Sequence, residues 1–537
     1  MRRETRWRCG AALMAGALLA FAWQREQPPA QFYGDIAIAE RNSAMGATDP
    51  SWSPDGSRIL FSLFGSLWIV AVSGGEATQI TAAPGYDAGA AWSPDGRTAA
   101  FLRGDGPIRG VQLGTQGRLF TVDLSTGKEQ QLAPELQFVG TPSWSPDGTS
   151  VYVNAAVGAE HTIYQVPLKG TPRRVTGVLY SRVPTIVPRG SAWFHSWYPL
   201  AVHRSGNEIA FGGDRDNTPQ LWRMPTREGL VLASKLTRYA ERDQADIQDV
   251  CWQDENVLLF SANRHSQETN FDIWRWKGGA AVPVTRTLYD EYSPRVAPDG
   301  KSVVFVSNYL GNPDLFLTTT AFHTARHLRI ERLRFRANSS KIRVRLRDES
   351  GKPTAARVSI RGADGKYYAP SGALLRVHPG MGEAAGFFHA RGEFDVEGPA
   401  GPFRIAAWRG IEYEPVVVTG AERDADIVLQ RRLRWQGEGW WSGEDHIHAN
   451  YAGPYYLRPD DALLMAEAED LNVSNLLVAN AEGARTYDRE FFEGKPSMLS
   501  TANHILYWNE EFRNRIVYGH MALLNLTALT DPLYTSF

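Results

Sequence analysis

The sequence predicts a mostly β, multidomain protein: a six-bladed β-propeller, then a small β-sandwich, then the beginning of an α/β domain. Three observations lead to this fold class. A Trp-Ser-Pro-Asp-Gly motif recurs through the first 325 residues, short alternating strands follow it, and a strand–helix–strand pattern lies near the C-terminal end. A chain of 537 residues is too long for one ordinary domain. Its 50 glycines, 31 prolines and 17 tryptophans favour many turns and aromatic strands.

The propeller prediction rests on an internal repeat. The motif occurs at Trp52-Ser-Pro-Asp-Gly56, Trp92-Ser-Pro-Asp-Gly96, Trp144-Ser-Pro-Asp-Gly148 and, less closely, Val296-Ala-Pro-Asp-Gly300. Degenerate copies at His203-Arg-Ser-Gly-Asn207 and Trp252-Gln-Asp-Glu-Asn256 bring the units to six. A short apolar strand is expected after each copy: residues 59–61, 99–101, 151–153, 209–211, 257–260 and 303–305. A second strand with an aromatic residue follows: 67–69, 119–121, 163–165, 221–223, 273–275 and 315–317.

Pro-Asp-Gly predicts a tight hairpin turn between the strands of each unit. Proline presets φ, aspartate can bond the backbone ahead of it, and glycine accepts a positive φ. Units of about 40–60 residues with several strands each are typical of propeller blades. The units resemble the TolB-like six-bladed propeller over residues 32–325. We expect pairing of N- and C-terminal strands to close the ring and remove its free edges.

The propeller loops carry no catalytic constellation, so we expect this domain to be a scaffold or a platform for a protein partner. An alternative is a substrate gate, by analogy with propeller-fused peptidases.

The N-terminus predicts export. Residues 1–8 contain four arginines, an apolar run follows from Ala11 to Trp23, and Ala20-Phe-Ala22 is a cleavage pattern. This is the layout of a signal peptide at residues 1–22, which places the mature protein in the periplasm or outside the cell. The alternative is an uncleaved N-terminal anchor. No later segment predicts a transmembrane span, and Cys9 and Cys251 make no disulfide framework.

The composition and net charge limit the classes of partner that we expect. The chain is 43% hydrophobic and 22% charged, values typical of folded protein, and its formal net charge of −2 gives no basic surface. We therefore expect no nucleic-acid partner.

Residues 330–432 predict a β-sandwich that connects the propeller to the last domain. Ile342–Leu346 and Ala356–Ile360 alternate strictly, as half-buried strands do. Turns at Asp348–Pro353 and Ala363–Gly365 separate further short strands, and the pattern resembles carboxypeptidase-regulatory-like sandwiches. His378 and His389 are expected to be surface or packing residues.

The last segment, residues 433–537, contains the candidate chemistry. His446 and His448 lie two residues apart, which puts both imidazoles on one face of a strand. Imidazole is a common ligand of divalent metals, but two ligands are not a site. Arg458-Pro459 predicts the start of a helix, and Val473–Val478 predicts a buried strand, so the order is that of a βαβ unit.

Further ligands are expected on the strands beyond this unit. A carboxylate in Tyr507-Trp-Asn-Glu-Glu511 and the imidazole in Tyr518-Gly-His520 could complete a metal cluster. Glu510 and Glu511 are adjacent, so either could be the ligand.

These motifs together resemble the CehA/McbA family of metallohydrolases in the PHP superfamily. The resemblance lies in DHIH, the helix ending AEDLNV, EEF and GHMALLNL, and covers about residues 433–530. It implies that His446, His448 and His520 bind metal and that Glu511 bridges metal ions. It also implies a divalent metal (zinc, manganese or iron) and hydrolysis of a small carbamate, ester, amide or phosphoester substrate. Asn480 and Glu482 are expected near the site, where the wider superfamily has Thr-Asp-His.

The segment departs from this family in length. A full βα barrel has about 250 residues, whereas the chain stops at Phe537. We therefore expect an incomplete barrel that lacks downstream ligands, and the sequence assigns no catalytic acid or base.

Two rival functions remain open. The protein could be a non-enzymatic periplasmic binding or scaffold protein with an inactive hydrolase domain. It could also be a propeller-fused serine peptidase, although no G-x-S-x-G elbow occurs and Gly439-Trp-Trp-Ser-Gly443 has the wrong spacing.

Overall fold

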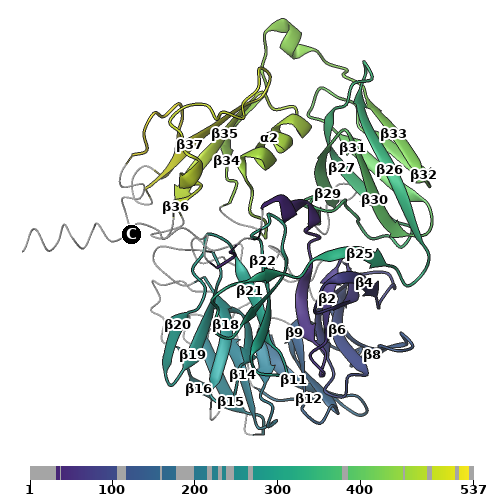
Figure 1. Cartoon of the computed structure of the whole chain (residues 1–537), viewed down its shortest axis with the longest axis vertical. Helices are drawn as coiled ribbons and strands as arrows, with labels where there is room; N and C mark the ends of the chain where they lie inside the picture. Colours follow the sequence, from purple (N-terminus) through teal and green to yellow (C-terminus); the bar gives the residue numbers. More distant parts are fainter. Residues whose placement is uncertain are drawn as a thin grey trace, which may run out of the picture.

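The structure is a computed structural model that describes residues 32–34, 36, 38–105, 117–157, 160–176, 199–213, 220–227, 233–237, 247–263, 270–377, 385–450, 454–480, 486–514 and 519–530. The predicted signal peptide, Cys9, His378 and Glu482 lie outside these residues. The described part is mostly β and multidomain, with propeller-type sheets below and two smaller sheet domains above (Figure 1).

Six antiparallel sheets of consecutive strands follow one another between Thr48 and His327. The first three sheets contain β1 (Thr48–Trp52), β2 (Arg58–Leu63), β3 (Ser66–Ala71) and β4 (Gly75–Gln79); β5 (Tyr86–Trp92), β6 (Thr98–Gly104), β7 (Arg118–Asp123) and β8 (Glu129–Leu132); and β9 (Gln137–Trp144), β10 (Ser150–Val157), β11 (Glu160–Pro167) and β12 (Arg173–Arg174). The other three contain β13 (Leu200–Val202), β14 (Glu208–Gly213), β15 (Gln220–Pro225) and β16 (Ser234–Lys235); β17 (Ile247–Trp252), β18 (Val257–Ala262), β19 (Asp272–Lys277) and β20 (Ala280–Pro283); and β21 (Glu291–Val296), β22 (Ser302–Ser307), β23 (Asp314–Thr319) and β24 (Arg326–His327). Every strand predicted from the repeat lies inside a strand of these sheets.

The Pro-Asp-Gly turns have the predicted conformation. In the first copy, Asp55 Oδ1 accepts the backbone N–H of Ser57 at 3.1 Å, and Gly56 has φ of 70°. Asp299 does the same for the N–H of Lys301 at 2.8 Å, and Gly300 has φ of 68°. A side chain at either glycine would be strained, because L-residues seldom adopt a positive φ.

The sheets surround a common centre. The first strands contact one another in chain order, from β1 through β5, β9, β13 and β17 to β21, and β21 contacts β1. Indole groups of the repeat join neighbouring sheets: Trp144 Nε1 donates to the carbonyl oxygen of Ala91 at 2.9 Å, and Trp252 Nε1 donates to that of Ala201 at 3.0 Å. Trp144 and Trp252 of the repeat therefore connect successive sheets, whereas Trp92 Nε1 donates to the carbonyl oxygen of Gly96 in its own turn.

A strand that follows the sixth sheet returns to the first. β25 (Ile330–Arg334) pairs in parallel with β4, which makes the first sheet five-stranded. The expected pairing of N- and C-terminal strands takes this form. Residues 330–334, which lie inside the range predicted for the sandwich, thus pair with the first propeller-type sheet instead, because β4 offers them an open edge.

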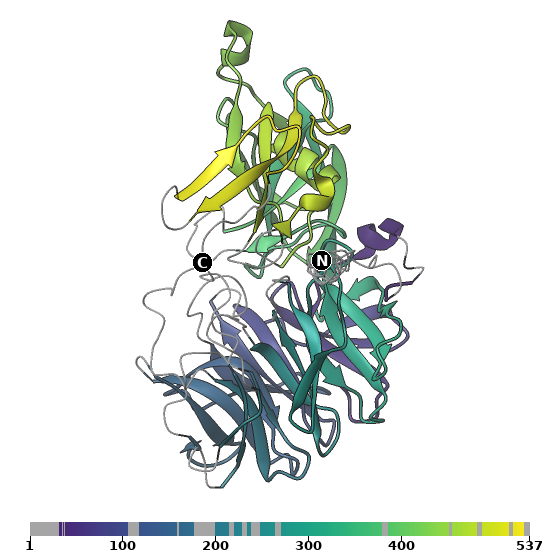
Figure 2. The same ribbon diagram turned by 90° about the vertical axis from the view of Figure 1, so that its left-hand side faces the viewer.

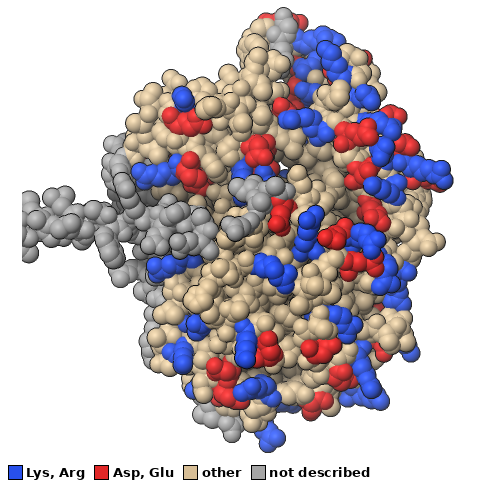
Figure 3. Space-filling view, in the orientation of Figure 1, with Lys and Arg blue, Asp and Glu red and all other residues tan. Residues whose placement is uncertain are grey.

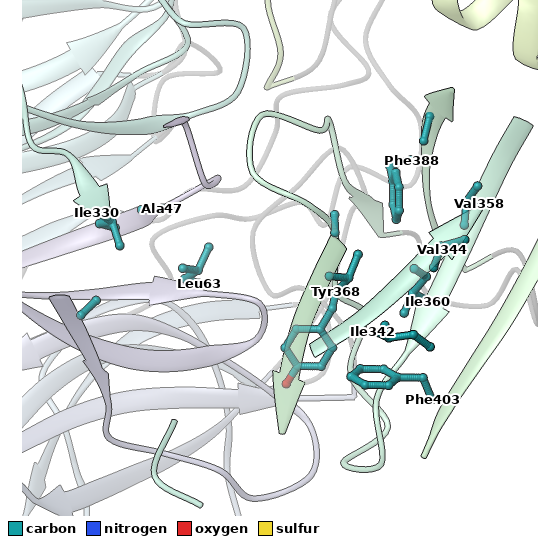
Figure 4. Close-up of a cluster of buried hydrophobic side chains, with 14 of the residues drawn as sticks. Ala47, Leu63, Ile330, Ile342, Val344, Val358, Ile360, Tyr368, Phe388 and Phe403 are labelled. Atoms are coloured by element: carbon teal, nitrogen blue, oxygen red, sulfur yellow. The ribbon is translucent and has the colours of Figure 1, made fainter. Parts of the chain in front are cut away.

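Two sheets follow β25 and share one core. The first contains β26 (Ser339–Asp348), β30 (Glu393–Pro399) and β33 (Asp424–Leu429), and the second contains β27 (Ala355–Arg361), β28 (Arg376–Val377), β29 (Gly386–Arg391), β31 (Phe403–Trp408) and β32 (Val416–Ala421). Their buried residues form one cluster with those of the first propeller-type sheet, and Figure 4 shows Ala47, Leu63 and Ile330 on one side and Ile342 and Phe403 on the other. The sandwich is therefore packed on the first sheet as a continuous core.

The outer face of the sandwich is highly charged. Basic side chains of β26 lie between acidic side chains of β30 and β33, with Lys341 Nζ 2.8 Å from Asp395 Oδ2 and Arg345 Nη2 2.9 Å from Asp424 Oδ1. Figure 3 shows this flank as interleaved blue and red side chains, without a large area of one sign. Among the described residues, no helix combines the length and the apolar character needed to span a bilayer.

The last domain is a mixed sheet with one helix against it. β34 (Gly443–Ile447), β35 (Val473–Asn480) and β37 (Ile505–Asn514) are parallel, while β38 (Gly519–Leu523) pairs antiparallel with β37 and β36 (Thr486–Tyr487) with β35. Helix α2 (Pro459–Ala468) connects β34 to β35, as the sequence predicts, with Pro459 in its first turn. Ala462 and Ala466 of α2 share a core with Leu476, Val478 and Trp508. Figure 2 shows this sheet beside the sandwich and above the propeller-type sheets.

Candidate metal centre

The predicted ligands come together at the carboxyl ends of the parallel strands. His446 is near the end of β34, His448 follows that strand directly, and Glu511 lies in the second half of β37. His520, on β38, pairs with Arg513 and is therefore a diagonal neighbour of Glu511 on the same face. Ligand sites of parallel α/β sheets lie at this edge, because the loops that leave it converge there.

His446, His448 and Glu511 form a compact triangle. Their ligand atoms lie within 4.8 Å of one another. The two Nε2 atoms are 3.1 Å apart, His448 Nε2 is 3.1 Å from Glu511 Oε2, and His446 Nε2 is 3.6 Å from Glu511 Oε1. The two imidazoles lie on one side of the strand, as the spacing predicts.

His520 lies beside this triangle rather than inside it. Its Nδ1 is 3.0 Å from Glu511 Oε1, the oxygen that also faces His446. Glu511 therefore has an imidazole against each of its two oxygens, and its carboxylate lies between His448 on one side and His446 and His520 on the other.

These residues fit a divalent metal ion. Two nitrogen ligands at about 2.0–2.1 Å from one tetrahedral zinc lie roughly 3.3 Å apart, close to the separations in the triangle. The Glu511 side chain is only 1% exposed, and a carboxylate so buried requires cationic or hydrogen-bonding partners. Imidazole and carboxylate ligands suit zinc, manganese and iron.

The site is accessible from one side. The side chains of His446 and His520 are 44% and 51% exposed, whereas that of His448 is 21% exposed. Structural zinc sites are closed by four protein ligands, while catalytic sites keep a position for water or substrate. The open triangle of side chains leaves space for such a position.

The structure distinguishes Glu511 from Glu510. Adjacent residues of a strand point to opposite faces, so only one of them can face the histidines. Glu510 Oε2 accepts the backbone N–H of Thr530 at 2.7 Å, and its other oxygen accepts the Thr530 hydroxyl. Glu510 therefore fixes the segment after β38, and Glu511 is the candidate ligand.

Buried amides support the strands beneath the ligands. Asn509 is fully buried, and its Nδ2 donates to Asn475 Oδ1 at 2.8 Å across β35 and β37. Asn475 Nδ2 donates in turn to the carbonyl oxygen of Glu444 on β34, at 3.3 Å. Asn480, expected near the site, is the last residue of β35.

The sequence did not identify Asn450 and Asp488, which hold the loop after His448. The backbone N–H and the side-chain amide of Asn450 donate to the two carboxylate oxygens of Asp488, at 3.3 and 2.6 Å. The one signal available in the sequence was the position of Asn450, two residues after the histidine pair. Asp488 lies far along the chain and carries no local signal.

The sandwich fixes the end of α2. Acidic residues at a helix C-terminus are unfavourable beside the helix dipole, and here they are compensated by hydrogen-bond donors of the sandwich. Arg357 and His389 both contact Glu469 Oε1 at 2.7 Å, and Arg431 Nη2 is 2.9 Å from Asp470 Oδ2. Burial lowers the pKa of His389. Burial alone raises the pKa of Glu469, but hydrogen bonds from His389 and Arg357 outweigh it and lower that pKa. His389 is thus a buried packing residue at a domain junction.

The propeller-type region contains a separate cavity of about 510 Å³. It is lined by the ends of the inner strands and by the repeat turns, including Trp92, Trp144, His203, Trp252 and Arg295. None of the candidate metal ligands lines it.

Comparison with known proteins gives partial matches. No protein-family model matches the chain. The chain is 30% identical over 148 residues to dipeptidyl-peptidase 5 of Porphyromonas gingivalis, covering 24% of this chain and 21% of that protein. It is 28% identical over 138 residues to the uncharacterized peptidase YuxL of Bacillus subtilis, covering 24% of this chain and 20% of that protein. The chain thus spans about a fifth of the length of these curated relatives.

Similar solved structures include propeller-type proteins. TolB from Acinetobacter baumannii matches with a TM-score of 0.38 and 20% identity, over 53% of this chain and 63% of that one. Oligogalacturonate lyase from Vibrio parahaemolyticus matches with a TM-score of 0.36 and 12% identity, over 65% and 89%.

Proposed function

We propose that this protein is an exported, metal-dependent hydrolase whose centre is formed by His446, His448, Glu511 and His520. The observation that carries the proposal is the triangle of His446, His448 and Glu511, with ligand atoms within 4.8 Å at the carboxyl edge of a parallel sheet. The resemblance to the CehA/McbA family and a six-bladed, TolB-like propeller belong to the same proposal.

The four side chains would bind zinc, manganese or iron. The histidines would act as neutral ligands, and Glu511 would reduce the net charge of the site. A bound metal supplies a water of lowered pKa and polarises the oxygen of a carbonyl or phosphoryl group. The Asn475–Asn509 pair holds β35 beside β37, so that the ligands keep their spacing.

The substrate class follows from this chemistry. A hydroxide-generating metal site hydrolyses esters, amides, carbamates or phosphoesters, and the exposed sides of His446 and His520 leave room for a small substrate. Two relatives are named as peptidases, which supports hydrolysis as the reaction class. A serine mechanism is disfavoured in this chain because the G-x-S-x-G elbow does not occur in it.

Elemental analysis of the purified chain tests the proposal. We expect stoichiometric zinc, manganese or iron in the wild type and its loss in the His446→Ala/His448→Ala double variant. His504→Asn is the matched control, because His504 Nδ1 donates to the carbonyl oxygen of Leu471 at the opposite edge of the domain. Metal-dependent hydrolysis of ester, amide and carbamate substrates would then be measured. Equal metal content in the wild type and the double variant would refute the site.

A second candidate function is a partner-binding platform without catalysis. The supporting observation is the cavity of about 510 Å³ in the propeller-type region, which is separate from the metal ligands. Thr141→Trp in the full chain would narrow this cavity. If partner binding is the function, Thr141→Trp should abolish partner binding and leave the metal content unchanged. The His446→Ala/His448→Ala variant should still bind the partner.

Export is tested separately. Residues 1–22 would direct the protein to the periplasm or the medium, so cell fractionation should find the chain there and Edman sequencing should find cleavage after Ala22. A chain that keeps these residues and remains with the membrane would instead be anchored.

A further inference from the structure

Asp488 lies where the loop after the histidine pair meets the sheet. It follows β36, which pairs with the carboxyl end of β35, and it is 1% exposed. Its backbone has φ of 64°, a left-handed conformation that non-glycine residues seldom adopt. Such a conformation persists only where the surrounding contacts stabilise it.

The contacts of Asp488 are directed to Asn450. Asp488 Oδ1 accepts the side-chain amide of Asn450 at 2.6 Å, and Oδ2 accepts its backbone N–H at 3.3 Å. This two-point contact fixes both the side chain and the main chain of a residue that lies two positions after His448. The direction in which the chain leaves His448 is thereby fixed.

Asn450 is also held from its other side. Its Oδ1 accepts the N–H of Leu457 at 2.7 Å, and its Nδ2 donates to the carbonyl oxygen of Leu457 at 2.9 Å. Leu457 packs in the core beneath α2, and Tyr456 donates its backbone N–H to Gly311 of the propeller-type region at 2.9 Å. The loop between His448 and α2 is therefore connected to the sheet, the core and the neighbouring domain.

We propose that Asp488 is a positioning residue that holds His448 in place for metal binding, acting through Asn450. The inference rests on the proposed metal centre and adds a residue outside its ligands. His448 is the more buried of the paired histidines, and it is 3.1 Å from both His446 and Glu511, so a small displacement would open two edges of the triangle. Loss of an outer contact to a metal ligand typically lowers metal affinity 10–100-fold.

Three variants separate this role from backbone strain. Asp488→Gly removes the carboxylate and relieves the left-handed backbone, so it isolates the contact to Asn450. Asp488→Asn keeps one carbonyl oxygen for Asn450 Nδ2, and asparagine tolerates the same φ. Asn472→Ala is the matched control, because the Asn472 side chain accepts the backbone N–H of Ser442 at the amino end of β34, away from the histidines.

The experiment is titration of the full-length, metal-free chain with Co²⁺, followed by visible absorption, which reports coordination geometry. We expect Asp488→Gly to weaken Co²⁺ binding at least 10-fold and to change the spectrum, and Asp488→Asn to recover most of the affinity and the wild-type spectrum. Asn472→Ala should lower the thermal midpoint without changing the spectrum.

Two outcomes would overturn the proposal in different ways. If the wild type takes up no Co²⁺, the metal centre fails and the role of Asp488 fails with it. If the wild type binds and Asp488→Gly has the same affinity and spectrum, the centre stands and Asp488 does not position His448. A thermal scan of each variant confirms that it is folded. If Asp488→Gly is unfolded, Asn450→Ala, which removes the side-chain contact from its other partner, provides the test: unchanged affinity and spectrum would overturn the proposal.

Discussion

Lys366 of the sandwich donates from Nζ to the carbonyl oxygen of Gly65, in the first propeller-type sheet, at 2.7 Å. The same ammonium donates to Ser66 Oγ at 2.8 Å. Burial lowers the pKa of Lys366, and the nearby carboxylates of Asp87 and Asp364 oppose this effect. A buried lysine with such partners connects two domains through polar contacts as well as through their shared apolar core.

Replacement of Lys366 should therefore weaken this junction. Lys366→Met removes the buried ammonium that donates to the Gly65 carbonyl and to the Ser66 hydroxyl, and we expect a loss of about 2–3 kcal/mol in the free energy of unfolding. The measurement is urea unfolding followed by tryptophan fluorescence. Lys301→Met, at an exposed turn, is the control and should change stability by less than about 0.5 kcal/mol. Equal stability of the two variants would show that the contact adds nothing.

Glu511 and Glu510 provide a matched pair for the metal centre. Glu511→Gln should lower metal affinity by more than about 10-fold, because it removes the charge that faces three imidazoles. Glu510→Gln should leave metal affinity unchanged and lower the thermal midpoint, since it weakens the contact to Thr530. Competition with a zinc chelator measures both affinities, and a larger effect of Glu510→Gln would reverse the assignment.

Glu291 should make stability depend on pH. Tyr33 and Thr287 donate to Glu291 Oε1 at 2.5 and 2.6 Å, and burial raises the pKa of this carboxyl to about 8 from its ordinary value of 4.5. Between these two pKa values the folded state keeps a proton that the unfolded state loses, so the stability of the wild type falls as pH rises from 4.5 to 8.

Glu291→Gln removes this titration. The free energy of unfolding of the wild type, relative to that of the variant, should decrease by a few kcal/mol between pH 5 and pH 8. Thermal or urea unfolding at several pH values measures this difference. Parallel curves for the two proteins would mean that Glu291 does not titrate in this range.

The tryptophans of the repeat should differ in their contributions to stability. Trp144→Phe removes the hydrogen bond to Ala91 in the neighbouring sheet, and about 1 kcal/mol should be lost. Trp92→Phe removes a bond from Nε1 to Gly96 in its own turn, at 3.1 Å, where water can replace the donor. Denaturant unfolding should therefore show a larger loss for Trp144→Phe, and the opposite order would argue against a role of the indoles between sheets.

The sequence predicted what local chemistry determines. Pro-Asp-Gly specifies its turn through the φ values and hydrogen bonds of three adjacent residues. The degenerate copies at His203 and Trp252 lack this triplet, and their strands were predicted from the apolar residues that follow and from the spacing of the repeat. The histidine pair was predicted to share one side because the period of a strand is two residues.

Contacts between distant residues could not be predicted in the same way. Nothing near residue 330 distinguishes a first sandwich strand from an edge strand that returns to β4, because the residues of a short strand do not specify which distant strand they pair with. The choice between Glu510 and Glu511 required knowing which face of β37 meets α2. The partnership of Asn450 and Asp488 depends on where two loops end, which no local pattern determines.

The parallel pairing of β25 with β4 also has a mechanical consequence. After the sixth sheet, the chain forms β25, which is hydrogen-bonded along β4 of the first sheet, and then continues into the sandwich. A pull on the sandwich along this strand would load the hydrogen bonds between β25 and β4 together in shear, rather than peeling them one by one. The hydrogen bonds between β25 and β4 would therefore share a load that passes along this strand into the first sheet.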